Sequence, residues 1–279
     1  MYLTLRIEDM RGLRCFMIVG LLSLLSFTAH AQCKFRNTAF SSGELLTYNL
    51  YYNWQFIWVK AGNASLSTIQ TVYKGTPAYR ASLVTRGSEK VDGMFILRDT
   101  LLCYSSTQLE PLYYRKGAKE GDRYTVDEVF YSYAGGKCDI KQHRQKSSGR
   151  HEWRQSSLDH CVYDMLNIFL RARSFSVSGW EKGHVVDFPI ADGNGVTPAR
   201  LVYQGKKNIK ADNNVKYRCL QLCYMEMEKG KYKRIVDFYV TGDENHVPVR
   251  LDMFLRFGSA KAFLINSKGL RNPVNSVVK

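Results

Sequence analysis

Large apolar side chains alternate with smaller or polar ones along most of this chain, which is the period of a β-strand. The clearest run follows Gly43-Glu44 and places an apolar residue at every second position: Leu46, Tyr48, Leu50, Tyr52, Trp54, Phe56 and Trp58. Successive side chains of a strand point to opposite faces, so all seven are predicted to share one face. That face must be buried or bound to a ligand. A turn is predicted after it, at Ala61-Gly62.

Shorter runs of the same kind continue on both sides of the middle of the chain. Strands are predicted over 63–73, 79–86, 95–104, 112–116, 123–133, 185–190, 199–206, 215–227, 234–240, 247–257 and 261–266. Lys74-Gly75, Gly135-Gly136 and Lys229-Gly230 are typical of tight hairpins, which favour an antiparallel meander. The polar segment 145–154 is predicted to be a loop, 32–42 a loose lead-in, and the tail from Asn272 to be frayed.

One stretch, Leu158–Arg171, has the period of a helix instead. Its apolar residues recur at helical spacing: Leu158, Cys161, Val162, Met165, Leu166 and Phe169. A second stripe is polar and holds His160, Asp164, Asn167 and Arg171. A single apolar helix between two runs of strands predicts a cover for a curved sheet, with Met165 and Phe169 pointing inward.

The fold predicted from these patterns is all-β with one main helix. A single long, curved antiparallel sheet would form an open or half barrel, with the helix on its concave face. We predict one β domain over residues 32–279, because no linker, repeat or low-complexity segment divides the chain.

The first 31 residues have the features of a secretory signal peptide. Arg11 and Arg14 precede an apolar core, and small residues around Ala31 suit cleavage, so the mature chain is predicted to start at Gln32. Two alternatives remain open. The segment could be a membrane anchor, although its apolar run is shorter than the roughly 20 residues that a spanning helix needs. Alternatively, Cys33 could be acylated as in a lipoprotein, although the residues before it suit that processing poorly.

Charge and cysteine content agree with an exported protein without fixing its partner. The chain carries a net charge of +15, which favours attraction to an anionic envelope surface, but dispersed Lys and Arg also serve to keep sheet edges apart. The export signal argues against nucleic acid as a partner.

Six cysteines follow the signal, which allows up to three disulfides of undetermined pairing. Cys219 and Cys223 are predicted not to bond each other, since they lie roughly 13 Å apart along one strand face.

Several blocks of the sequence resemble a known family. Gly43-Glu44-Leu45-Leu46-Thr47-Tyr48 and Lys60-Ala61-Gly62-Asn63-Ala64 are similar to its opening, and Tyr163–Arg171 is similar to its mid-chain segment. Thr241-Gly242-Asp243-Glu244-Asn245-His246-Val247-Pro248-Val249-Arg250 and Phe257-Gly258-Ser259-Ala260-Lys261 are similar to its ending. The family is domain of unknown function 3108, found in exported Gram-negative and Bacteroidota envelope proteins. The resemblance implies an envelope protein built mainly of antiparallel strands, and it implies no activity, cofactor or catalytic residue.

Two groups of residues could carry chemistry. His160 and Asp164 could pair and form a general base, but a solvated helix face is the simpler interpretation of the polar stripe. The aromatic run Tyr48, Tyr52, Trp54, Phe56 and Trp58 could stack on sugar rings or, together with Met165 and Phe169, line a groove for an acyl chain, although a sheet core explains most such runs. His246 lies beside Asp243 and Glu244, a spacing that indicates a turn before it indicates a metal site.

The sequence therefore predicts a non-enzymatic, exported envelope protein that binds a lipid or another amphipathic ligand, without a metal or other cofactor. A structural or protein-interaction module of the outer envelope is the first alternative, and a hydrolase of envelope glycans is the second. The hydrolase would require two carboxylates converging in a cleft.

Overall fold

We analysed a computed structural model of the chain, which describes residues 33–54, 57–89, 96–255 and 258–278. By its internal contacts, Ala31–Lys279 forms one compact unit, and everything below concerns that unit. The predicted signal peptide lies outside the described residues. No helix in the described part of the chain is long and apolar enough to cross a membrane.

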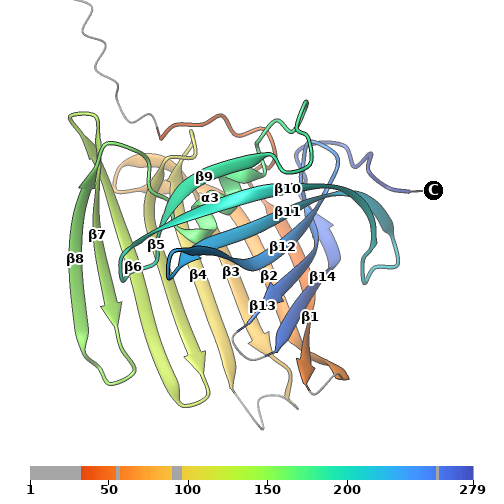
Figure 1. Cartoon of the computed structure of the whole chain (residues 1–279), viewed down its shortest axis with the longest axis horizontal. Helices are drawn as coiled ribbons and strands as arrows, with labels where there is room; N and C mark the ends of the chain where they lie inside the picture. Colours follow the sequence, from red (N-terminus) through yellow and green to blue (C-terminus); the bar gives the residue numbers. More distant parts are fainter. Residues whose placement is uncertain (1–32, 55–56, 90–95, 256–257, 279) are drawn as a thin grey trace, which may run out of the picture. The chain divides into compact units, whose positions relative to one another are not determined.

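Fourteen antiparallel strands form one sheet (Figure 1). The strands are β1 (Glu44–Trp54), β2 (Ile57–Tyr73), β3 (Thr76–Gly87), β4 (Leu97–Ser106), β5 (Pro111–Glu120), β6 (Arg123–Ala134), β7 (Lys137–Gln145), β8 (His151–Leu158), β9 (Val185–Ala191), β10 (Val196–Lys210), β11 (Lys216–Glu228), β12 (Lys231–Thr241), β13 (Pro248–Phe254) and β14 (Ser259–Lys268). The helix α3 (Met165–Ala172) lies between β8 and β9 in the chain. The predicted all-β class with one helix on a curved, open antiparallel sheet is confirmed.

The order of the strands explains how the chain builds an open sheet. From β1 the meander runs outward to β8 at one edge, and α3 then carries the chain to β9 at the opposite edge. From β9 the meander returns, and β14 pairs with β1. The predicted hairpins at Lys74-Gly75, Gly135-Gly136 and Lys229-Gly230 are present, and all six residues have positive φ, as a type I′ turn requires.

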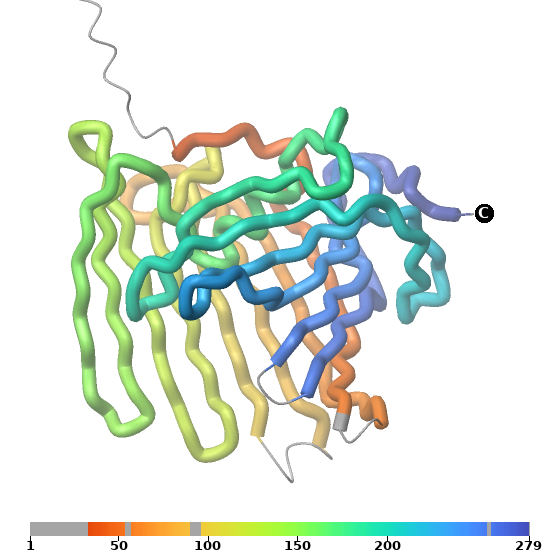
Figure 2. The backbone as a smooth tube through the Cα atoms, in the orientation of Figure 1, coloured from red at the N-terminus to blue at the C-terminus, as the bar shows by residue number. Residues whose placement is uncertain are grey.

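The sheet curls until its two ends approach each other without pairing. Strands β9–β12 pass in front of β3–β6, with α3 between the two layers (Figures 1 and 2). The β9–β10 turn reaches the inner face of β6 and β7, where the Gly193 backbone N–H donates to Gln142 Oε1 at 3.1 Å. At the same turn Arg144 lies 3.6 Å from the carboxylate of Asp192. Side chains of α3 fill the enclosed space.

The helix joins two apolar clusters. Leu166 and Leu170, one turn apart, are buried in the larger cluster with residues of β1, β4–β7 and β14, among them Leu46. Ile168 belongs to the second cluster, which β9–β12 supply. Because both layers pack on the same short helix, α3 determines how far apart they stand.

The helix is shorter than the predicted Leu158–Arg171, and that prediction was wrong at its start. Leu158 ends β8, and Asp164 is the N-cap of α3. Asp164 Oδ1 accepts hydrogen bonds from the backbone N–H groups of Leu166 at 3.0 Å and Asn167 at 2.8 Å. Its Oδ2 accepts from the Tyr131 hydroxyl on β6 at 3.1 Å. The apolar residues before Asp164 follow helical spacing only by coincidence, because they pack from an extended segment.

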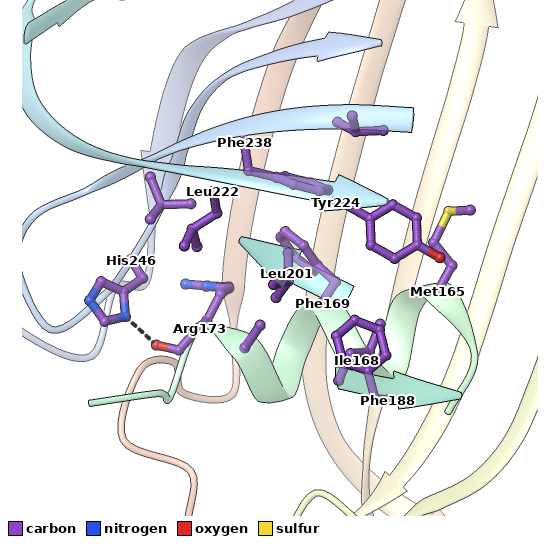
Figure 3. Close-up of a pocket in the computed structure, with 13 residues that line it drawn as sticks. Met165, Ile168, Phe169, Arg173, Phe188, Leu201, Leu222, Tyr224, Phe238 and His246 are labelled. Carbon is purple, nitrogen blue, oxygen red and sulfur yellow. Dashed lines mark hydrogen bonds between the residues drawn. The ribbon is translucent and has the colours of Figure 1, made fainter. Parts of the chain in front are cut away.

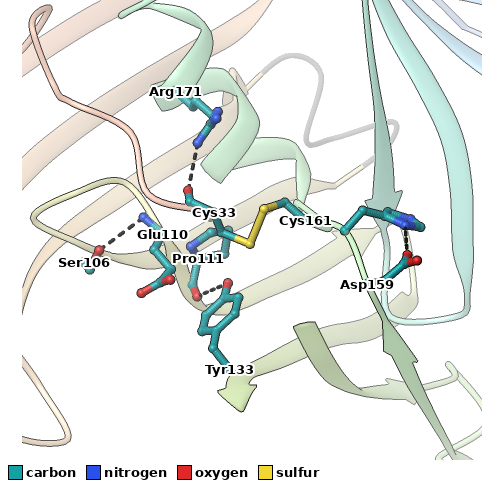
Figure 4. Close-up of a disulfide and its surroundings, with 9 residues drawn as sticks. Cys33, Ser106, Glu110, Pro111, Tyr133, Asp159, Cys161 and Arg171 are labelled. Carbon is teal, nitrogen blue, oxygen red and sulfur yellow. Dashed lines mark hydrogen bonds and ion pairs between the residues drawn. A yellow bond between two sulfur atoms is a disulfide. The ribbon is translucent and has the colours of Figure 1, made fainter. Parts of the chain in front are cut away.

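Both chain ends of the described unit are held in place, which corrects the predicted loose lead-in and frayed tail. In the lead-in, Cys33 bonds Cys161 (Figure 4), and Phe40 is fully buried. In the tail, the Ser276 hydroxyl donates to Asp243 at 2.6 Å, and Val277 forms a β-bridge with Tyr217. Polar side chains fix both segments, so hydrophobic patterning alone did not reveal them.

Two further strand predictions were wrong. Residues 145–154, predicted as a loop, contain the end of β7, a turn and the start of β8. Strand β8 lies at the sheet edge with both faces largely exposed, so it lacks an alternating pattern.

The turn predicted at Ala61-Gly62 lies inside β2. A Cβ on Gly62 would stand 2.0 Å from the carbonyl oxygen of Arg86, so glycine is required there by close approach of β3.

A buried ion pair anchors the end of α3. The two terminal nitrogens of Arg173 lie 2.5 and 2.8 Å from the Glu44 carboxylate at the start of β1, and both side chains are at most 2 % exposed. Arg173 Nη2 and Nε also donate to the carbonyl oxygen of Asn245, at 3.0 and 3.1 Å. These contacts engage four of the five N–H donors of the guanidinium, in line with the pairing that a buried charge requires.

We expect Glu44→Gln to lower the free energy of unfolding by about 3–5 kcal/mol, because it leaves the Arg173 charge buried without its counterion. Equilibrium urea unfolding followed by circular dichroism measures this loss. The double variant Glu44→Leu/Arg173→Met removes both charges and is expected to lose much less. Equal losses in the single and double variants would contradict a role for charge pairing.

The N-cap makes stability depend on pH. Burial raises the pKa of Asp164 to about 6, although its hydrogen bonds oppose the shift. Because the folded pKa lies above the unfolded value of 3.8, this carboxyl favours folding most below pH 4, and its contribution is lost as the pH rises through about 6. The two pKa values differ by about 2 units, on the order of 3 kcal/mol.

We expect Asp164→Asn to flatten the fall in stability between pH 4 and 6, because asparagine caps the helix without a buried charge. Burial also raises the pKa of Asp99 to about 6, so the quantity to measure is the difference between the parent chain and the variant in urea unfolding at each pH. Asp164→Ala is the matched control: it also lacks the carboxyl, so its pH curve is expected to be flattened as well, but about 1–2 kcal/mol below that of Asp164→Asn at every pH because the cap itself is lost. Parallel pH curves for the parent and Asp164→Asn would contradict the assignment.

Candidate ligand pocket between the helix and the sheet

An apolar pocket lies between α3 and the strands β9–β12 (Figure 3). The residues that line it are Met165, Ile168, Phe169, Ala172 and Arg173 of the helix and its C-cap, Phe188, Leu201, Leu222, Tyr224, Val236, Phe238 and Val240 of the strands, and His246. Its volume is about 60 Å³. That volume equals the share of about two water molecules, whereas pockets for drug-sized ligands measure about 300–1,000 Å³.

The strands supply one continuous apolar face to this pocket. In the register, Leu222 lies opposite Phe238, and Tyr224 lies opposite both Leu201 and Val236. Residues two apart on each strand therefore point at the helix. Strand β11 is covered on both faces, since its other face carries buried Cys219 and Cys223.

Four Phe and Tyr rings form part of the pocket wall. Phe169 of the helix lies 5.9 Å from Phe238, and Phe188 stacks on Tyr224 at 6.2 Å, both measured between ring centroids. The Tyr224 hydroxyl donates to Glu226 at 2.5 Å, so its hydrogen bond is made to a residue that does not line the pocket. Burial raises the pKa of Tyr224, which therefore stays neutral.

Two polar side chains border the pocket at one end. Arg173 is occupied by Glu44 and Asn245, as described above. His246 Nδ1 lies 2.6 Å from the carbonyl oxygen of Arg173, so this nitrogen carries the proton and donates (Figure 3). Burial lowers the pKa of His246, which keeps the ring neutral near pH 7. Both groups therefore serve the fold, and the pocket offers shape and apolar contact to a ligand.

The residues predicted to bind a ligand are not brought together. Met165 and Phe169 line the pocket, with Met165 44 % exposed at its rim. Tyr48 instead lies buried in the larger cluster, and Tyr52 is half-buried on β1. Trp58 belongs to β2 and is 39 % exposed, so the aromatic run does not continue along a single strand. The side chain of Trp54 and all of Phe56 lie outside the described residues.

The predicted polar stripe is not a solvated helix face. Asp164 and Asn167 are buried and bond each other, with Asn167 Nδ2 2.5 Å from Asp164 Oδ2. His160 precedes the helix and lies 2.8 Å from Asp159. Arg171 donates to the carbonyl oxygen of Cys33 at 2.8 Å (Figure 4). The suggested His160–Asp164 base is therefore not formed.

Cysteine pairing gives one disulfide among the described residues, Cys33–Cys161, which joins the lead-in to the segment before α3 (Figure 4). Cys161 was predicted to be a core residue of the helix, and the disulfide corrects this. Cys103, Cys138, Cys219 and Cys223 are free and buried, and burial raises the pKa of each thiol. No group of three or more His, Cys, Asp or Glu side chains in the described part of the chain could hold a metal ion.

Comparison with solved structures shows the same fold in another protein. The beta-barrel-like protein of domain of unknown function DUF1849 from Brucella abortus matches with a TM-score of 0.54 at 10 % identity, over 82 % of this chain and 98 % of that one. A protein from Bacteroides fragilis NCTC 9343 assigned as exported, with a YmcC-like fold, matches with a TM-score of 0.35 at 8 % identity, over 85 % of this chain and 100 % of that one. A protein from Parabacteroides distasonis ATCC 8503 assigned as a lipoprotein matches with a TM-score of 0.37 at 9 % identity, over 85 % and 99 %.

Sequence comparison identifies the family directly. No curated protein matches the chain significantly. The sequence profile of the protein family of unknown function DUF3108 matches residues 47–265, which is most of the chain and confirms the resemblance seen in its opening, middle and ending. The chain therefore belongs to the DUF3108 family.

Proposed function

We propose that this chain is an exported envelope protein that holds one hydrophobic chain of an amphipathic molecule between α3 and the strands β9–β12. The observation that supports this most is an apolar pocket that is not sealed. Thirteen residues line it, ten of them aliphatic or phenylalanine, and Met165 at its rim is 44 % exposed. Ligand sites in proteins are concave and mostly apolar, with few polar groups.

The volume of the pocket defines how a ligand must enter. About 60 Å³ accommodates only the end of an acyl chain. In the proposal, the rest of the chain lies along the groove that opens when Met165 turns outward. Methionine suits this position, because its unbranched side chain changes rotamer easily and adapts to different apolar partners.

The disulfide supports export. Disulfides persist in oxidising compartments outside the cytoplasm, and Cys33–Cys161 closes a loop of 128 residues. Cleavage after Ala31, as predicted, would make Cys33 the second residue of the mature chain. A cysteine whose sulfur is bonded to Cys161 has no sulfur available for lipid attachment, so the pairing favours the signal peptide over the lipoprotein alternative.

A structural or protein-interaction module is the second candidate. The edge strand β8 favours it, because its residues are largely exposed and it pairs only with β7. The most buried carboxylates are Asp164, Asp237 and Glu44. Asp164 caps a helix, and the other two are paired with Arg234 and Arg173, so they do not favour the glycan hydrolase.

Filling the pocket tests ligand binding. We expect Ala172→Leu to weaken binding of a fluorescent fatty acid by about ten-fold or more, because the added methylenes occupy the cavity. Thermal stability is expected to stay equal or rise, since the substitution buries apolar volume. Fluorescence titration and a melting curve measure the two effects.

Ala134→Leu provides the matched control, because it makes the same change at an exposed position next to a hairpin turn. It is expected to bind like the parent chain. If the parent binds no fatty acid and Ala172→Leu only raises the melting temperature, the pocket is a packing defect and the second candidate holds.

The cysteine arrangement tests export. In protein isolated from its host without reductant, we expect alkylation and mass spectrometry to find Cys33 and Cys161 protected, and the four other cysteines reactive only after unfolding. Cys161→Ser is expected to cost about 4–5 kcal/mol, given the long loop that the disulfide closes. A free Cys161 together with a lipid on Cys33 would identify a lipoprotein instead.

A further inference from the structure

Two neighbouring hairpins carry an exposed apolar patch at one end of the sheet, away from the pocket. The tip patch consists of Ile57, Trp58 and Val59 at the start of β2, and of Phe254 and Leu255 at the end of β13. Their exposed fractions are 66, 39 and 41 %, and 39 and 48 %. The two hairpins lie at the lower right in Figure 2.

Strand pairing brings these residues together. Trp58 lies opposite Asn53 on β1, Asn53 lies opposite Ser259 on β14, and Ser259 lies opposite Phe254 on β13. Four adjacent strands, β2, β1, β14 and β13, therefore end in one row at this place. Two more exposed apolar residues lie toward the same end of the sheet: Ile96, which precedes β4, and Tyr124, near the start of β6, are 36 and 42 % exposed.

The start of β2 projects beyond the core on both faces. Ile57 and Val59 point to one face and Trp58 to the other, yet all three are exposed. The alternation of buried and exposed residues resumes only after Gly62. Exposed apolar side chains on both faces of a strand end are unfavourable in water and indicate a partner that surrounds the tip.

Four other hairpin turns in the described part of the chain are built from polar residues and glycine: Lys74-Gly75, Gly121-Asp122, Gly135-Gly136 and Lys229-Gly230. The tip patch departs from the composition of these four turns.

Basic side chains border the patch. Lys261 Nζ lies 4.1 Å above the Trp58 ring, the Arg234 guanidinium lies 4.6 Å above the Phe254 ring, and Lys60 is exposed beside Val59. Asp237 pairs with Arg234, and Asp252 pairs with Arg250. Lys60 and Lys261 therefore supply the positive charge at the border, in a chain of net charge +15.

We propose that the tip patch inserts into the headgroup layer of an anionic lipid membrane, with Trp58, Ile57 and Leu255 in the acyl boundary and Lys60 and Lys261 on the anionic headgroups. Tryptophan is enriched at this depth, where its ring is apolar and its N–H remains hydrated. The proposal concerns a surface distinct from the pocket and holds whether or not the pocket binds a ligand.

Vesicle flotation tests the proposal with the mature chain from Gln32. We expect binding to vesicles of phosphatidylglycerol and phosphatidylethanolamine, and weak binding to phosphatidylcholine. Ile57→Ser/Val59→Ser/Leu255→Ser is expected to lower the partition coefficient by about ten-fold or more, because three apolar contacts are lost. Lys60→Gln is expected to lower it by about five-fold on the anionic vesicles, an effect that high salt removes.

Val72→Ser/Val274→Ser is the matched control, since both residues are exposed apolar side chains outside the patch, 63 and 42 % exposed. It is expected to bind like the parent chain. In the unsubstituted chain, brominated lipid is expected to quench tryptophan fluorescence, and Trp58→Phe to remove most of that quenching. This readout does not depend on the folding of the triple variant.

Absence of binding to anionic vesicles would overturn the proposal, as would equal loss in the control and the triple variant. A concentration-dependent dimer in analytical ultracentrifugation that the triple variant abolishes, without vesicle binding, would assign the patch to self-association instead.

Discussion

The buried ion pair between Arg173 and Glu44 is the contact on which the open sheet depends. A sheet whose edges do not meet has no ring of hydrogen bonds to fix its curvature. Here the curvature is fixed by α3, which packs on both layers and is secured at both ends. Arg173 ties its C-terminal end to β1 and to the loop before β13. At its N-terminal end, Asp164 bonds Tyr131 of β6, and the adjoining segment carries the disulfide.

This arrangement explains why the helix is short, polar at its ends and apolar in its middle. Leu166 and Leu170 pack on one layer and Ile168 on the other, while Met165 stays 44 % exposed at the pocket rim. At the helix ends, buried Asp164 and Arg173 bond Tyr131 and Glu44, which are distant in sequence. The pocket lies on the side of β10–β12, where the side chains of the helix and the strands do not fill the space between them.

Sequence patterns predicted the strands well because most of them have one buried face. Patterning failed where that condition was absent, as in the exposed edge strand β8. It also failed at Trp58, because alternation continues from β1 into β2 and does not show where the chain reverses. Asp164 was assigned to a polar stripe although it is a good N-cap residue, since the apolar residues before it extended the helical pattern. The Arg173–Glu44 pair joins residues 129 apart, and nothing local reveals it.

The central claim is that α3 is an integral part of the core and opens only when the whole unit unfolds. Native-state hydrogen exchange measures this directly, through the amides of Ile168 and Arg173, which donate to the carbonyl groups of Asp164 and Phe169. The account predicts that both exchange with the same free energy and denaturant dependence as amides in β1 and β14. Exchange of the α3 amides at a markedly lower free energy, while the sheet stays protected, would show a helix that opens independently and would contradict it.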